Sequence, residues 1–114
     1  MSKPRIPQPG DLIKLNFDPH AGREQAGWRP ALVISKAAYN QRSKLALICP
    51  ITSQAKGYPF EVPLPDGGVL QGVVLADHVK SADLKARGAK HVGAAPREVL
   101  DTVRAYIALL IGLK

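Results

Sequence analysis

Two runs of aliphatic residues constrain the fold of this chain more than any other feature of its sequence. Residues 29–35 read RPALVIS, and residues 44–51 read KLALICPI. Both runs are bounded by polar segments, which is typical of central strands buried on both faces of a sheet. The segment between them, KAAYNQRS, is expected to form a turn or a single helical turn. The rest of the fold must be built around these two strands.

Three further strands are predicted. Residues 11–17, DLIKLNF, alternate apolar and polar side chains approximately, as a half-buried strand does. Residues 58–64 and 68–76 supply two more strands, joined by PDGG, a strong turn signal. Because no crossover helix separates the five segments, they predict a small, strongly curved antiparallel sheet or a partly open barrel.

The last third of the chain has a different character. Residues 81–87 are expected to hold a short helix capped by Ser81. A longer helix is expected from Pro96, which suits the first helical position. One apolar face of this helix comprises Val99, Leu100, Val103, Tyr106, Ile107 and Leu110, and its last turn adds Leu109, Ile111 and Leu113. The apolar end needs cover on more than one side, from the chain's own sheet or from a second subunit, and the pattern does not choose between them.

The size and charge of the chain limit what it can be. Its 114 residues suit one compact domain spanning residues 1–114. The formal net charge is +7, and the sequence pI is near 9.9. Such a charge attracts polyanions, which include nucleic acid, acidic protein tails and anionic membranes, although charge alone does not choose among them.

The expected compartment is the cytoplasm. The lone cysteine, Cys49, lies in an apolar run, where a thiol behaves as a small buried hydrophobe. The first ten residues, MSKPRIPQPG, hold four prolines or glycines and no apolar core of a signal peptide. The apolar stretch AYIALLIGL is far shorter than the roughly 20 residues that span a bilayer.

No metal site and no cofactor are predicted. His20, His78 and His91 are far apart in the sequence, and neither a CxxC nor an HExxH pattern exists. The glycine-rich phosphate-binding motifs of nucleotide-dependent enzymes are also absent from the sequence.

Polar residues suited to phosphodiester chemistry gather at two predicted strand ends. They are Arg23, Glu24, Gln25 and Arg29 around the first loop, and Thr52, Ser53, Gln54 and Lys56 after the third strand. Adjacent antiparallel strands would bring both groups to one rim, where a base and cationic donors could cleave RNA, whose 2′-hydroxyl is an internal nucleophile. The alternative is that Glu24 and Arg29 form an ordinary surface ion pair and Thr52 only ends a strand.

Four segments, in this order and spacing, resemble the signatures of the MazF/PemK toxins. They are GDLIKLNFDP, GREQAGWRPALVIS, CPITSQAKGYPFEVPL and GVVLADHVKSADLKARGA. The resemblance implies an SH3-like small β-barrel of the CcdB/PemK type with a C-terminal helix, and a homodimer. It also implies metal-independent cleavage of single-stranded mRNA to 2′,3′-cyclic phosphate and 5′-hydroxyl ends, and neutralisation by an acidic MazE-like antitoxin.

The same resemblance assigns catalysis to Glu24, Arg29 and Thr52. Glu24 is expected to be the base, and Arg29 is expected to act electrostatically because a guanidinium with a pKa above about 12 is a reluctant proton donor. The group that protonates the leaving oxygen is left open. Some relatives carry a catalytic histidine where this chain has Arg23 and an arginine where it has Leu75, so a histidine-based mechanism is not expected.

Contacts to RNA are expected from basic, polar and aromatic side chains around this rim. They are Arg23, Gln25, Trp28, Ser53, Gln54, Lys56, Tyr58, Asp77, His78, Lys80, Lys85 and Arg87. Trp28 could instead pack against the barrel, Asp77 could make only a structural hydrogen bond, and His78 replaces the commoner glutamine of the family's DQV signature. Two rival functions stay open, a CcdB-like inhibitor of DNA gyrase and an RNA-binding module without nuclease activity.

Overall fold

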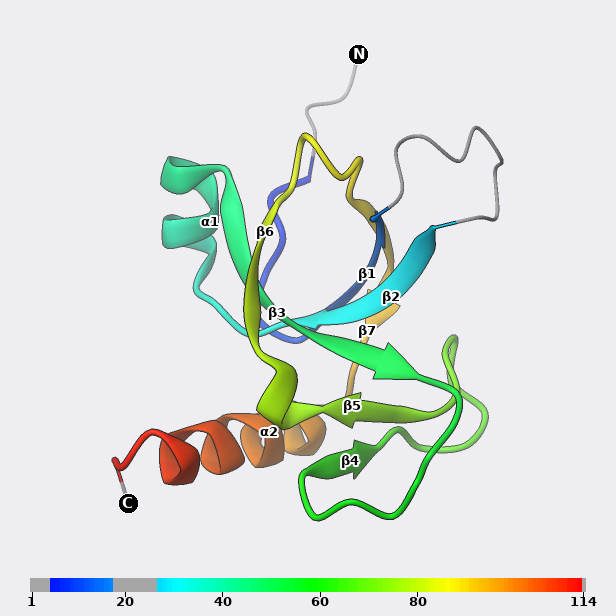
Figure 1. Cartoon of the computed structure of the whole chain (residues 1–114). Coiled ribbons are helices and arrows are strands. Elements are labelled where there is room, and N and C mark those ends of the chain that lie inside the picture. The colour runs from blue at the N-terminus through cyan, green and yellow to red at the C-terminus, as the bar shows by residue number, and fades with distance from the viewer. Residues whose placement is uncertain (1–4, 18–26, 114) are drawn as a thin grey trace.

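A computed structural model describes residues 5–17 and 27–113 of the chain (Figure 1). The described residues form seven strands, two α-helices and one short 3-10 helix. In chain order they are β1 (Asp11–Asn16), β2 (Trp28–Val33), α1 (Ala37–Ser43), β3 (Leu45–Thr52), β4 (Glu61–Pro63), β5 (Val73–Leu75), η1 (Ala76–His78), β6 (Lys80–Asp83), β7 (Lys90–Ala94) and α2 (Arg97–Leu110).

All strands belong to one antiparallel sheet in the order β4-β5-β3-β2-β1-β7, with β6 also paired to β3. The long strand β3 joins the two parts of this sheet, because β6 pairs with its first half and β5 with its last residues. The predicted antiparallel sheet with a C-terminal helix is therefore confirmed. Among the described residues β4 and β7 do not pair with each other, so the sheet is open between its ends.

The prediction that the two aliphatic runs form strands buried on both faces is confirmed for most of both runs, but Leu47 in the first half of β3 is 39% exposed. On one face, Leu32 of β2 and Cys49 of β3 pack into a core that is closed by β4, β5 and α2. On the other face, Val33 and Ile48 pack with Ile13 of β1 and with Ala82 of β6. Successive side chains of a strand point to opposite faces, so continuous aliphatic runs were needed to fill two cores.

The short helix predicted at residues 81–87 is wrong. Residues Lys80–Asp83 form β6 instead, and a turn follows that leads into β7, a strand that the sequence did not predict. β6 pairs with Leu45 to Ile48 of β3, and Ala82 is buried by this pairing. Pairing to a buried neighbour therefore outweighs the weak helical preference of the segment.

Two hairpin strands are shorter than predicted. The segment 58–64 contributes only Glu61–Pro63 as β4, and the segment 68–76 contributes only Val73–Leu75 as β5. These two strands pair antiparallel, and the PDGG sequence lies in the connection between them. Strand pairing begins again only at Val73, which pairs with Thr52 at the end of β3.

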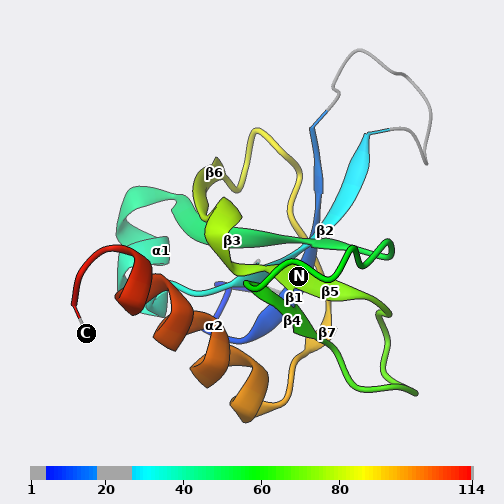
Figure 2. The ribbon, with the colours of Figure 1, turned by 60° about the horizontal axis from the view of Figure 1, so that its bottom comes forward.

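The two α-helices differ in length and in how many of their residues are buried. α1 has seven residues, more than a single turn, and ends at Lys44, whose φ of 64° is left-handed. α2 follows Pro96, which lies just before the helix, and it buries Val99, Leu100 and Val103 against the sheet (Figure 2). The end of α2 and the residue that follows it are exposed by contrast, since Leu109 is 53% and Ile111 64% accessible. Among the described residues no helix is both long and apolar enough to span a bilayer.

Candidate functional site

Arg29 and Thr52 lie at neighbouring ends of β2 and β3. The last pair between these strands joins Ala31 to Pro50, and Arg29 and Thr52 each lie two residues beyond it. By the alternation of a strand, both point to the face that holds Val33 and Ile48. Past that pair the two strands diverge (Figures 1 and 2), so these polar side chains stand at the open end of the sheet.

The hydroxyl of Thr52 is oriented by its own loop. The backbone N–H of Gln54 donates a hydrogen bond to Thr52 Oγ1 at 3.2 Å. Since the oxygen accepts this bond, its hydroxyl proton remains able to donate to an incoming acceptor such as a phosphate oxygen. Thr52 is half-buried, and Arg29 is exposed. The pair can therefore present a hydroxyl donor and a guanidinium to one anion.

The predicted residues Ser53, Gln54, Lys56 and Tyr58 lie together in the exposed loop between β3 and β4. Glu61 shapes this loop, because its carboxylate accepts hydrogen bonds from two backbone N–H groups. The Lys56 N–H donates to Glu61 Oε2 and the Gly57 N–H to Glu61 Oε1, both at 3.0 Å. Sequence reasoning missed Glu61, since it lies within a strand pattern.

Two predicted cations meet on an aromatic ring that the sequence assigned only to a strand. The Nζ of Lys80 in β6 lies 4.5 Å from the ring centre of Phe17, and the guanidinium carbon of Arg87 lies 5.5 Å from it. Cation–π attraction fixes both cations beside the end of β1. Phe17 also packs against the same core as Ile48. A positively charged surface therefore adjoins the start of β2, close to Arg29.

Trp28 takes an intermediate position between the two predicted alternatives. Its side chain is half-buried, and the Nζ of Lys90 in β7 lies 4.8 Å from its ring centre. A Cβ on Gly88 would touch the Trp28 ring at 3.5 Å. The ring thus packs along the turn before β7 and keeps part of its surface accessible. Lys90 is a further cation at this end that the sequence did not single out.

Asp77 and His78 follow β5, the strand whose first residue pairs with Thr52. Both lie in η1, with an Asp77 Oδ1 to His78 Nε2 distance of 3.7 Å. Ala76 beside them approaches Cys49, which is three residues, or roughly 10 Å of strand, from Thr52. Burial, and secondarily the charge of Asp77, raises the pKa of Cys49 to about 12. This thiol is therefore protonated and takes no part in the rim.

Three predicted site residues, Arg23, Glu24 and Gln25, lie outside the described residues. The structure consequently places the phosphate-binding candidates but not the proposed base. Within residues 5–17 and 27–113, no group of three or more histidine, cysteine, aspartate or glutamate side chains could hold a metal ion. The described part of the rim offers guanidinium, ammonium and hydroxyl donors, which suit binding of phosphate groups.

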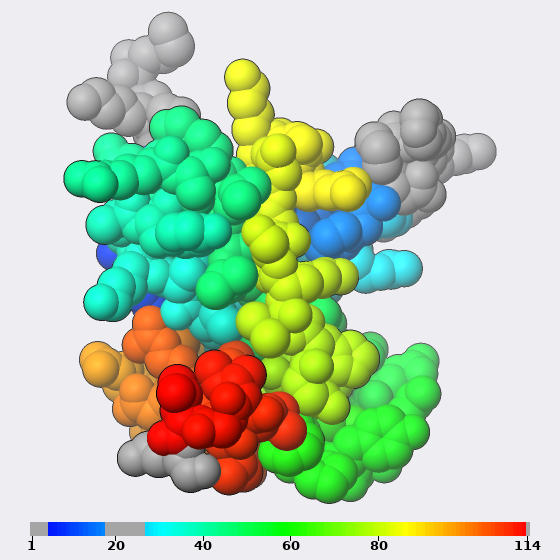
Figure 3. Space-filling view, turned by 60° about the vertical axis from the view of Figure 1, so that its left-hand side comes forward, coloured from blue at the N-terminus to red at the C-terminus, as the bar shows by residue number. Residues whose placement is uncertain are grey.

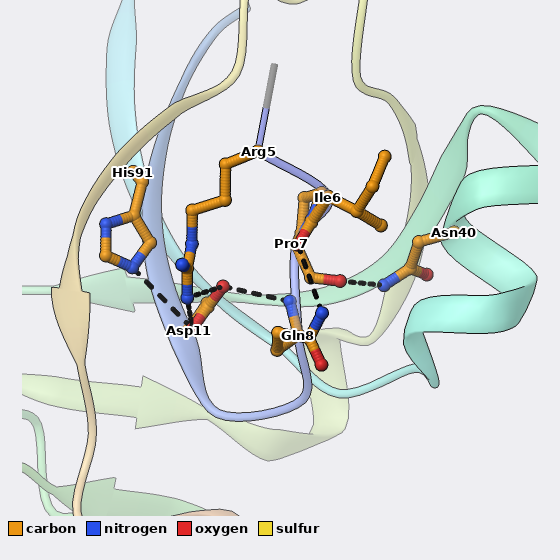
Figure 4. Close-up of polar contacts among 7 residues, drawn as sticks. All are labelled: Arg5, Ile6, Pro7, Gln8, Asp11, Asn40 and His91. Atoms are coloured by element: carbon orange, nitrogen blue, oxygen red, sulfur yellow. Dashed lines mark hydrogen bonds and ion pairs between the residues drawn. The ribbon is translucent and has the colours of Figure 1, made fainter. Parts of the chain in front are cut away.

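A cavity of about 810 Å³ opens on the same side of the sheet as this rim. It lies between the segment before β1, α1 and the chain from Leu84 to His91. Figure 4 shows one wall, where Arg5, Asp11 and His91 meet. One Arg5 nitrogen donates to both Asp11 oxygens at 3.2 Å, and His91 Nε2 lies 3.6 Å from Asp11 Oδ1.

Comparison with known proteins gives a consistent result. The family model described as PemK-like, MazF-like toxin of type II toxin-antitoxin systems matches residues 8–111. The chain is 50% identical over 107 residues to the endoribonuclease toxin MazF of Escherichia coli K12, covering 94% of this chain and 96% of that relative. It is 44% identical over 97 residues to the endoribonuclease toxin ChpB of the same organism, with 81% and 83% of the chains covered.

Solved structures agree with the sequence relatives. MazF from Deinococcus radiodurans is 51% identical and superposes with a TM-score of 0.85, covering 96% of this chain and 99% of that one. A MazE-MazF structure from the same organism is 47% identical, with a TM-score of 0.86 and coverage of 96% and 98%.

Proposed function

This chain belongs to the PemK-like, MazF-like toxin family of type II toxin–antitoxin systems, and we propose that it is an endoribonuclease that cuts single-stranded mRNA at short sequences. The similarity that carries the proposal is the 50% identity, over nearly the whole chain, to a relative named an endoribonuclease toxin. Messenger RNA is a cytoplasmic substrate, so the proposed compartment is the cytoplasm. The proposed unit is a single domain over residues 1–114.

In the proposed reaction, Glu24 accepts the proton of the RNA 2′-hydroxyl as that oxygen attacks the adjacent phosphorus. The bond from phosphorus to the 5′-oxygen breaks, which leaves a 2′,3′-cyclic phosphate, and the departing oxygen takes up a proton to become a 5′-hydroxyl. No metal is needed, because the nucleophile belongs to the substrate. Arg29 and Thr52 donate hydrogen bonds to the phosphate oxygens as negative charge develops on them.

The position of the donors supports this assignment. Arg29 is exposed and can present a planar, two-pronged donor to a phosphate. Thr52 has its oxygen engaged by the Gln54 N–H and its proton available to donate. Lys80 and Arg87, held on Phe17, provide positive charge for the neighbouring phosphates of the strand.

We propose that an acidic, MazE-like antitoxin neutralises the protein. The relative from Deinococcus radiodurans has been solved as a MazE-MazF structure. The net charge of +7 favours association with an acidic segment. Competition between antitoxin and RNA for the charged rim is the simplest mode of inhibition.

We propose that the protein forms a homodimer through a surface of exposed hydrophobic side chains. Figure 3 shows α1, β6 and the end of α2 on one side of the molecule. Large hydrophobic side chains are exposed along these elements and the residues next to them, namely Tyr39, Leu47, Val79, Leu109, Leu110, Ile111 and Leu113. Large exposed hydrophobic side chains on one side of a molecule favour a protein interface there. The seven residues are called the apolar face below.

We also propose that the curved sheet forms the SH3-like small barrel of the CcdB/PemK type. Support comes from β3, which pairs with β2 along one edge and with both β5 and β6 along the other. The same architecture occurs in rival functions, so it does not by itself distinguish a nuclease from a gyrase inhibitor.

The proposed activity is tested by incubating the purified protein with a long unstructured RNA in EDTA and analysing the product ends. Cuts at a recurrent short sequence, with 2′,3′-cyclic phosphate and 5′-hydroxyl ends, are expected. RNA binding without strand scission would contradict the proposal and favour a binding module. Inhibition of DNA gyrase without any cut in RNA would favour the CcdB-like alternative.

A further inference from the structure

The cavity of about 810 Å³ falls within the size range of small-ligand pockets. It lies on the same face of the sheet as the rim, because Ile13 lines it and Leu15, two residues along β1, belongs to the same core. Leu15 is the direct partner of Arg29. The cavity therefore begins roughly 7 Å along β1 from the strand position that carries Arg29.

The wall formed by the segment before β1 is fixed at two points. Asp11 is only 3% exposed, and its carboxylate holds the Arg5 guanidinium and also accepts the Gln8 N–H at 2.9 Å. Asn40 of α1 is 1% exposed, and its Nδ2 donates to the Pro7 carbonyl at 2.9 Å (Figure 4). Buried polar contacts of this kind hold a pocket open in one defined shape.

The charge around the cavity is predominantly positive. Lys44 at the end of α1 and Lys85 in the turn after β6 both line it, and the Leu84 N–H donates to the Lys44 carbonyl at 3.2 Å. The two lysines thus stem from adjoining stretches of chain. The ion pairs found within residues 5–17 and 27–113 include neither lysine. Asp11, the one carboxylate in the lining, is already engaged by Arg5.

The remaining lining is largely apolar. Ile6, Ile13, Leu84 and Ala89 contribute side chains to it. His91 pairs with Ile13 across β1 and β7, so its ring lies on the cavity side of the sheet. A site with an apolar interior, an imidazole and two unpaired cations suits a ligand that combines a flat ring with a phosphate.

We propose that this cavity binds one nucleotide unit, with its base against the apolar lining and its phosphate beside Lys44 and Lys85. The nucleotide is part of the RNA substrate, bound away from the scissile phosphate, and in this respect the inference rests on the proposed function. Binding energy from such a remote unit improves capture of the RNA and selects its sequence. A free mononucleotide has the same chemistry and is the second source to be distinguished.

The first experiment titrates each of the four nucleoside 5′-monophosphates into the protein and follows the ring proton resonances of His91. Saturable shifts are expected for at least one nucleotide. The double variant Lys44→Glu with Lys85→Glu should weaken binding at least tenfold. The charge-matched control Lys14→Glu with Lys36→Glu, which changes two exposed lysines that do not line the cavity, should change it little. Lack of saturable binding, or an equal loss in both double variants, would overturn the proposal.

The second experiment identifies the source of the nucleotide. If it belongs to the RNA, the Lys44 and Lys85 double variant raises KM for a long RNA about tenfold with kcat nearly unchanged, and the free nucleotide competes with RNA. If it is a free ligand, nucleotide binding is lost while KM stays constant. Absence of RNA cleavage by the unmodified protein would refute the proposed function alone. The nucleotide titration, followed by the His91 resonances, would still decide whether the cavity binds nucleotides.

Discussion

Gly72 lies against the backbone of Thr52 so closely that no side chain fits between them. A Cβ on Gly72 would lie 2.1 Å from the Thr52 carbonyl oxygen and 2.9 Å from the Cα of Ser53. Its φ of +120° is also a conformation that other residues rarely adopt. The next residue, Val73, pairs directly with Thr52. Gly72 thereby fixes the position of the Thr52 backbone at the rim.

The substitution Gly72→Ala should therefore impair cleavage by displacing Thr52. We expect kcat to fall about 100-fold for a displacement of the order of 1 Å, with a much smaller change in RNA affinity. The matched control is Gly67→Ala, which has a φ of +85° and no atom within 4 Å of its Cβ. Comparison of kcat and RNA Kd for the two folded variants checks this. Equal activity of the two would contradict a positioning role.

Asn40 should contribute strongly to stability. It is buried, and its Nδ2 donates to the carbonyls of Pro7 and Ser35, so Asn40→Ala leaves both without this partner. We expect the free energy of unfolding to fall by about 1–3 kcal/mol. The exposed neighbour Gln41→Ala should cost less than about 0.5 kcal/mol. Denaturant unfolding at one protein concentration measures both, and similar midpoints for the two variants would refute the role of Asn40.

The apolar face should mediate dimerisation. Leu110, which is 46% exposed at the end of α2, lies in this face, and Leu110→Glu would place a charge in the interface. We expect sedimentation velocity to show a dimer for the unmodified protein and a monomer for the variant. Val69→Glu introduces the same charge at an apolar residue that is 65% exposed in the β4–β5 connection, outside the apolar face, and should remain dimeric. A monomeric unmodified protein at micromolar concentration would contradict the proposal.

Cys49 should be unreactive in the folded protein. Burial, and secondarily the charge of Asp77, raises the pKa of its thiol from 9.0 to about 12. Iodoacetamide at pH 8 should therefore modify the thiol only after denaturant is added, because the thiolate is the reactive form. Since the folded pKa lies above the unfolded one, the protonated thiol contributes its full share to the free energy of unfolding below pH 9. This contribution is lost as the pH rises from 9 to about 12. Rapid alkylation of the folded protein at pH 8 would contradict this.

The central strands can be predicted from the sequence because strands buried on both faces consist of continuous aliphatic residues. β6 and β7 have no such signal, since their residues are mostly exposed and Ala82 is the only fully buried side chain among them. Their strand conformation arises from pairing with β3 and β1. Edge strands of this kind are specified by neighbours that are distant in the sequence, which a local pattern cannot represent.

The rim could be predicted only in part for the same reason. Arg29 directly precedes one aliphatic run and Thr52 directly follows the other, so both can be recognised in the sequence as polar residues at strand ends. Phe17 was assigned to a strand, and its contact with Lys80 requires β6 to lie beside it. Gly72 and the cavity likewise depend on segments far apart in sequence, such as Pro7 and Asn40, which are 33 residues apart.

The most direct test of the central claim is the single-turnover rate of RNA cleavage in EDTA for Arg29→Ala and Thr52→Ala, with RNA affinity measured in parallel. Arg42→Ala in the exposed part of α1 is the control. We predict that each rim variant loses a factor of about 100 to 1,000 in rate, as removal of a donor to a developing charge does, and that the control keeps its activity. Cleavage by both rim variants at the rate of the control would contradict the claim that this rim is the active site.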